Sequence, residues 1–155
     1  MRTLLQRVSW AKVEINGKIV GQIQKGLLVL LGVAHGDTDA HCQFIIEKLT
    51  NLRIFEDDTG KMNLSLLDIK GELLVVSQFT LYADCKKGRR PSFTDAAAPD
   101  VARDMYKKFV QKCSVTGLKV EQGEFGANMA VSLCNSGPVT IMLDTRPESV
   151  AADGG

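Results

Sequence analysis

Apolar and polar positions alternate on both sides of Asn16-Gly17, over residues 8–23. An apolar residue at every second position is typical of a strand with one buried face, and Asn-Gly readily adopts the positive φ angles of a two-residue turn. The pattern therefore predicts a β-hairpin. Two later segments, residues 26–34 and 71–83, are apolar at nearly every position and predict strands buried on both faces.

Apolar residues at helical spacing follow each of the two buried strands. Thr38 can cap a helix whose apolar face comprises Cys42, Ile45, Leu49 and Leu52. Pro99 suits the first position of a second helix with one apolar face, made of Val101, Met105, Phe109 and Cys113. With further strands over 118–124 and 129–134, the pattern predicts an α+β fold: a strongly bent, antiparallel-rich sheet or small β-barrel with two packed helices.

The segment from Leu133 to Leu143 alternates like a strand but carries Gly137-Pro138 in its middle. Proline has no amide hydrogen to donate to a neighbouring strand, so it belongs at an edge, a bulge or a turn. We therefore expect the sheet to be interrupted here, and a plain trans hairpin turn is one way to interrupt it.

Length and composition restrict the class of protein. A chain of 155 residues with 45% hydrophobic content suits one domain, which we expect to span residues 1–147, with a flexible tail over 148–155. A net charge of +1 means that a polyanion must bind to a local basic patch. The longest apolar run, residues 27–34, is too short to cross a bilayer, and we expect a soluble cytoplasmic protein that does not bind a membrane.

Metal and thiol chemistry have little support in the sequence. The four cysteines are scattered, and the chain has only two histidines, so we expect no metal and no other cofactor. A Cys-His nucleophile remains an option, with Cys42 or Cys85 beside His35 or His41. Cys42 falls on a helix's apolar face, where a small core residue is the simpler interpretation.

Polar side chains stand at the end of the second buried strand: Ser77, Gln78 and Thr80, around Phe79. They either form turn hydrogen bonds or point into a site. A threonine hydroxyl needs a base to act as a nucleophile, and none is near in sequence. Alternatively, backbone amides there can form an oxyanion cradle.

A basic loop follows this strand, with its cations at Lys86, Lys87, Arg89 and Arg90. Such a run is either a solvated face or a binding site for a phosphate backbone.

The motifs SQFTLYAD, KKGRRPSF, GEFGANMAV and NSGPVT together resemble the D-aminoacyl-tRNA deacylase family. These enzymes free tRNA from D-amino acids by hydrolysing the ester bond. The similarity runs from residue 6 to residue 140. One departure is Ser136 before the Gly-Pro pair, where we expect an acidic residue in many relatives.

The resemblance implies a homodimer with two active sites at the subunit interface. Each site would combine the catalytic segment Ser77, Gln78, Phe79 and Thr80 of one subunit with Gly137 and Pro138 of the other. Gly137-Pro138 would be cis, with its carbonyl oxygens aimed at the substrate's α-ammonium. Arg7 would brace the turn, Met129 would line the pocket, and the cations of residues 86–90 would bind tRNA.

A filter of this kind would reject L-aminoacyl-tRNA by steric exclusion and let glycine pass. The resemblance leaves two routes open: direct attack by Thr80, or water assisted by the substrate's own 2′-hydroxyl, which we favour because no base is visible. A different class of function, a noncatalytic module that binds the 3′ end of RNA, would use the basic loop and the aromatic residues Phe79, Tyr82, Phe93 and Phe125.

Overall fold

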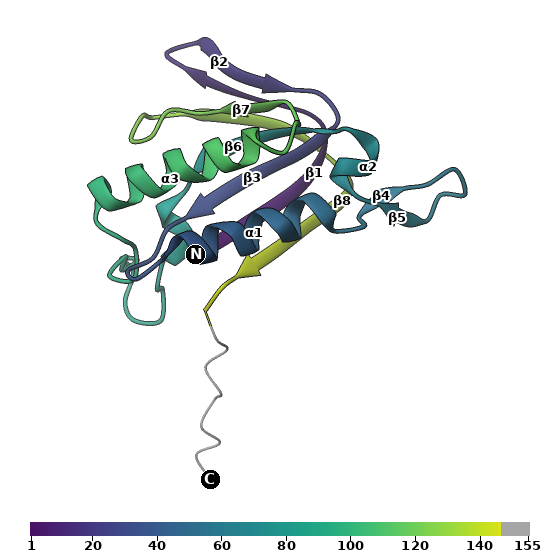
Figure 1. Ribbon diagram of the computed structural model, residues 1–155. Coiled ribbons are helices and arrows are strands. Elements are labelled where there is room, and N and C mark those ends of the chain that lie inside the picture. The colour runs from purple at the N-terminus through teal and green to yellow at the C-terminus, as the bar shows by residue number, and fades with distance from the viewer. Residues whose placement is uncertain (147–155) are drawn as a thin grey trace.

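The computed structural model describes residues 1–146, and its main feature is a six-stranded sheet with two long helices on one face (Figure 1). The predicted tail over 148–155 lies outside the described residues. The elements, in chain order, are β1 (Arg2–Ile15), β2 (Lys18–Ile23), β3 (Gly26–Gly32), α1 (Asp39–Asn51), β4 (Phe55–Glu56), β5 (Met62–Leu64), α2 (Leu66–Ile69), β6 (Glu72–Ser77), the 3₁₀ turn η1 (Phe79–Tyr82), α3 (Pro99–Ser114), β7 (Val120–Gln122) and β8 (Ala130–Asp144).

The predicted hairpin is present and forms the frame of the sheet. Asn16 and Gly17 have φ angles of 50° and 78°, as a two-residue hairpin turn requires. The returning chain pairs with β1 twice, first as β2 and then as β3, which runs antiparallel to β1 from Val8–Gly26 to Arg2–Gly32. Both β2 and β3 are therefore hydrogen-bonded to the same strand, β1.

Parallel pairing occupies the centre of the sheet. β3 pairs in parallel with β6, and β6 with β7, so that Leu31 lies opposite Ser77. At the far end, a Cβ atom on Gly21 of β2 would lie 2.7 Å from the carbonyl oxygen of Gln122 in β7. The sheet is thus mixed and curls almost into a barrel, which confirms the predicted α+β class and adds a third, four-residue helix, α2.

Two apolar cores lie on opposite faces of the sheet, because successive strand residues point to opposite sides. The first core packs β-strand residues such as Val29 and Val75 against α1 and α3. The second fills the concave face of the sheet with Val8, Ala11, Val13, Ile23, Leu28, Leu74 and Val76. Among the described residues, no helix is both long enough and apolar enough to cross a membrane.

Both long helices occur where the periodicity places them, with one correction. Pro99 begins α3, and Met105, Phe109 and Cys113 are buried as predicted, but Val101 is 53% exposed. A spacing of four residues overshoots a full helical turn by about 40°, so three such steps rotate Val101 well away from Cys113. Ala102 and Tyr106 take its place on the buried face.

The Gly-Pro pair interrupts β8 without ending it. The ladder between β1 and β8 passes from Val8–Asn135 to Gln6–Thr140, so residues 136–139 lie outside it. The bond between Gly137 and Pro138 is cis. β8 pairs with β1 alone among the strands of residues 1–146, so the proline lies in a bulge on an edge strand.

Candidate active site

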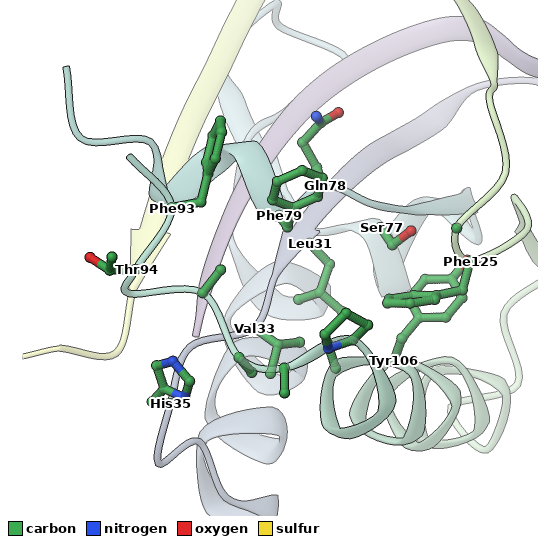
Figure 2. A pocket seen from close by; sticks show the side chains of 16 residues that line it. Leu31, Val33, His35, Ser77, Gln78, Phe79, Phe93, Thr94, Tyr106 and Phe125 are labelled. Atoms are coloured by element: carbon green, nitrogen blue, oxygen red, sulfur yellow. The ribbon is translucent and has the colours of Figure 1, made fainter. Parts of the chain in front are cut away.

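A cavity of about 570 Å³ opens where β3 and β6 end (Figure 2). One side is formed by the end of β6 and the start of η1, and another by the segment from Phe93 to Pro99 that leads into α3. The lining residues are mainly apolar: Leu31, Val33, His35, Ser77, Gln78, Phe79, Phe93, Thr94, Ala96, Ala97, Ala98, Pro99, Ala102, Tyr106, Phe125 and Gly126. Three of the four predicted catalytic residues therefore meet in one pocket.

The end of β6 fixes these residues through its pairing with β3. The amide of Gln78 donates to the carbonyl oxygen of Leu31 at 2.7 Å, and the chain then turns into η1. The amides of Phe79 and Thr80 begin this short helix, where no earlier turn offers them an acceptor. Neither amide hydrogen-bonds to another described residue.

Side chains of the same segment point to the rim of the cavity. Phe79 is 56% exposed, and its ring meets the ring of Phe93 edge to face at a centroid distance of 5.0 Å. The side-chain amide of Gln78 donates to the hydroxyl oxygen of Thr80. Thr80 itself is exposed beside the cavity and does not line it.

Acid-base groups are sparse around the cavity. Among the described residues that line it, only His35 and Tyr106 have titratable side chains. The Tyr106 hydroxyl donates to the carbonyl oxygen of Val75 at 2.8 Å, and burial raises the pKa of Tyr106 to about 12. His35 is the one imidazole among the described lining residues, but no hydrogen bond joins it to Thr80, whose hydroxyl accepts from Gln78 instead.

The structure does not support the Cys-His option. Cys42 is buried in the first core with its Sγ 3.7 Å from Met105 Sδ, and burial raises the pKa of its thiol to about 11. His41 accepts a hydrogen bond from the amide of Thr38 and caps α1. The cavity is lined by His35 but by none of the described cysteines.

Arg7 joins the Gly-Pro bulge to the rest of the fold. It is only 8% exposed; its Nε donates to the carbonyl oxygen of Ser136 at 2.9 Å and its Nη1 to that of Ile54 at 2.7 Å. A Cβ atom on Gly137, whose φ is 130°, would lie 2.9 Å from Arg7 Nη2 and from a methyl group of Val139. Glycine is therefore required at this position.

Within one chain, the two halves of the predicted site lie apart. Arg7 pairs with Leu27 near the start of β3, whereas Ser77 pairs with Leu31 near its end. Leu27 and Leu31 are four residues apart in β3, so the two halves differ by about 13 Å in their position along the strand. Neither Gly137 nor Pro138 lines the cavity.

The remaining predicted binding residues lie in two other places. Met129 packs against the second core, where its sulfur would lie 2.6 Å from a Cβ atom on Gly123, and it does not line the cavity. The cations of the basic loop, Lys86, Lys87, Arg89 and Arg90, are all exposed. A bridge between Asp84 and Ser92 closes this loop just before Phe93, so it stands beside the cavity's rim.

Sequence reasoning missed most of the wall opposite η1. The wall contains Ala96, Ala97 and Ala98, whose methyl side chains do not distinguish a binding site from any other loop. Phe93 is the residue of this wall that its aromatic ring made a candidate for binding. Tyr82, a candidate stacking residue only for the alternative RNA-binding module, is 2% exposed and has no face open to a base. In residues 1–146 no three metal-ligating side chains cluster closely enough to hold a metal ion.

Comparison with known proteins gives consistent matches over nearly the whole chain. The sequence model of the family described as D-Tyr-tRNA(Tyr) deacylase matches residues 4–144. A protein of Thermosipho africanus named D-aminoacyl-tRNA deacylase is 60% identical over 146 residues, which are 94% of this chain and 98% of that protein. One of Fusobacterium nucleatum with the same name is 53% identical and covers 97% and 99% of the two chains.

Two solved structures share the fold. A structure described as the c-Myc DNA unwinding element binding protein superposes with a TM-score of 0.89 at 38% identity, covering 95% of this chain and 100% of that one. A probable eukaryotic D-amino acid tRNA deacylase has a TM-score of 0.80 at 21% identity, with coverage of 92% and 97%.

Proposed function

The chain belongs to the D-Tyr-tRNA(Tyr) deacylase family, and on this premise we propose that it hydrolyses the ester bond between a D-amino acid and the 3′-terminal ribose of tRNA. The family match carries this proposal, because it spans both the cavity and the Gly-Pro bulge. We place the reaction in the cytoplasm, where aminoacyl-tRNA is used.

In the proposed complex, the ester lies at the mouth of the cavity. The amides of Phe79 and Thr80 donate to the oxyanion that forms on the ester carbonyl, because they lack intrahelical acceptors. Gln78 orders the ribose, and Ser77 and Phe79 fix the position of the substrate against the apolar wall. Met129 completes the pocket of the assembled dimer.

The amino-acid end of the substrate is held by a second copy of the chain. The carbonyl oxygens of Gly137 and Pro138 of the partner subunit accept hydrogen bonds from the α-ammonium, while Arg7 keeps that bulge in place. An L side chain would then collide with the partner's backbone, whereas a D side chain points to solvent. Glycine has no side chain and would not collide in either case. The roughly 13 Å that separates the motif halves in one chain favours a site built from two chains.

The reacting water is assisted by the substrate itself. The Thr80 hydroxyl accepts a hydrogen bond from the Gln78 side-chain amide and none of the described residues is bonded to it as a base, so direct attack by Thr80 has little support. The 2′-hydroxyl next to the ester can orient and activate water without any help from an acidic or basic side chain.

Matched D- and L-aminoacyl-tRNA test the proposed function. We expect the D ester and glycyl-tRNA to be hydrolysed and the L ester to be spared at the same enzyme concentration, with ester loss followed over time. Equal rates for both enantiomers would contradict the chirality filter. Tight binding of tRNA without turnover of either ester would favour the noncatalytic RNA-end module instead.

A tRNA that ends in 2′-deoxyadenosine, with the D-amino acid on its 3′-oxygen, tests the role of the 2′-hydroxyl. It should bind like the normal substrate but be hydrolysed at least about 100-fold more slowly, a range typical of removing an acid-base group. Thr80→Ala should retain most of the turnover of the normal substrate. Fast hydrolysis of the deoxy substrate, together with an inactive Thr80→Ala variant, would make Thr80 the nucleophile.

Mixing two inactive variants tests the shared site. Phe79→Ala disables the cavity, and Gly137→Ala disables the bulge because its Cβ atom would clash with Arg7 and Val139. After unfolding and refolding together, random pairing should restore roughly a quarter of the wild-type activity, since half of the dimers then contain one intact site out of two. A site built within one chain would give no recovery, and each variant refolded alone is the control.

The basic loop is the proposed contact for the tRNA backbone. Lys87→Ala combined with Arg89→Ala should weaken binding equally for all attached amino acids and flatten its salt dependence by about 0.7 per lost contact with single-stranded phosphate. Replacing two exposed lysines far from the cavity, Lys18 and Lys61, provides a control with the same change in charge. An identical salt slope in both double variants would mean that the loop is only a solvated surface.

A further inference from the structure

Tyr82 ends the segment that carries the proposed catalytic residues, and its ring lies near two guanidinium groups. The Cζ atom of Arg2 is 4.8 Å from the ring centroid, and that of Arg146 is 4.7 Å from it. Tyr82 is 2% exposed, so its ring is shielded from water, and cation–π contacts are stronger with a ring that is removed from water. Residues from near both ends of the described chain therefore meet at η1.

Arg2 ties η1 to two strands. Its Nη1 donates to the carbonyl oxygen of Leu81 at 2.8 Å, and its Nε donates to Asp144 Oδ2 at 2.8 Å. Leu81 directly follows Thr80, and Asp144 is the last residue of β8. The backbone of η1 is thus fixed to the start of β1 and the end of β8.

Arg146 ties the same point to the opposite wall of the cavity. Its Nη1 lies 3.4 Å from Asp95 Oδ2, and its Nε lies 3.7 Å from Asp144 Oδ1. Asp95 stands between two residues that line the cavity, Thr94 and Ala96, and its carbonyl oxygen accepts the amide hydrogen of His35. Arg146 therefore connects both sides of the pocket.

The Tyr82 hydroxyl does not take part in these contacts. Its oxygen is buried and has no hydrogen-bond partner among the described residues, which is an unfavourable position for a polar atom. The two arginines contact the aromatic ring of Tyr82 and not its hydroxyl.

We propose that Arg2, Tyr82 and Arg146 form a clamp that positions η1 against the segment of residues 93–98 and so sets the place of the Phe79 and Thr80 amides in the cavity. The proposal rests on the function proposed above. The three residues are positioning residues, because they act through the backbone of η1 and not on the substrate. Since a displacement of about 1 Å can cost about 100-fold in rate, a loosened clamp should lower kcat more than it weakens binding.

The test compares Arg146→Gln with Arg103→Gln in the full-length protein. Arg103 also lies over an aromatic ring of the cavity wall, Phe125, at 5.3 Å, but it has no bond to η1. Arg146→Gln should lower kcat for D-aminoacyl-tRNA about tenfold or more while KM changes by less than about twofold, and Arg103→Gln should leave kcat within about twofold. Tyr82→Phe keeps the ring and should retain the wild-type rate, whereas Tyr82→Leu should behave like Arg146→Gln.

Hydrogen exchange provides a readout that does not depend on turnover. The amides of Leu81, Tyr82 and Ala83 should exchange faster in Arg146→Gln, while amides of β3 and β6 remain as in the wild type. Unchanged kcat and unchanged exchange would overturn the clamp, and so would equal losses of kcat in the two arginine variants. A wild-type protein without turnover would instead reject the proposed function, and the exchange data would still decide whether the clamp positions η1.

Discussion

The hydrogen bonds between the parallel strands β3 and β6 join two strands that are buried on both faces, and they determine where each strand ends. Leu31 opposite Ser77 sets the level at which the chain leaves the sheet, and the bond from Gln78 to Leu31 turns it into η1. Because the connection between parallel strands must cross back over the sheet, α1 covers one face and leaves the strand ends open. The cavity is the space at these ends, walled by the segment that leads into α3.

A second constraint acts at the other end of β3. Arg7 is almost fully buried, and two backbone carbonyl oxygens, of Ser136 and Ile54, accept its hydrogen bonds. A buried guanidinium needs such partners, so the bulge and the segment before β4 must stay in place together. The motif halves are thus each held in place, but at different ends of the sheet, and this separation is the observation that supports the proposed two-subunit site.

Local signals were enough to predict much of the fold. The turn at Asn16-Gly17, the first residue of α3 at Pro99 and the two doubly buried strands all depend on residues close in sequence, and all are present. The prediction that Val101 lies on the buried face of α3 was wrong, because residues spaced four apart rotate progressively around a helix. The arrangement of Arg2, Tyr82 and Arg146 escaped prediction because it joins residues that are far apart along the chain, and nothing near Tyr82 in the sequence distinguishes a clamped ring from an exposed one. The three alanines at 96–98 line the cavity because of where the fold places them, and their side chains give no sign of this in the sequence.

The interruption of β8 also changes what the edge of the sheet offers to another chain. An unpaired strand edge fifteen residues long would offer a nearly continuous row of backbone donors and acceptors to the edge of any other chain. Residues 136–139 leave the ladder in the middle of this edge, and Pro138 has no amide hydrogen to give. The bulge divides the edge into two shorter segments, and a short edge is a poorer template for pairing with a strand of another chain than a long one.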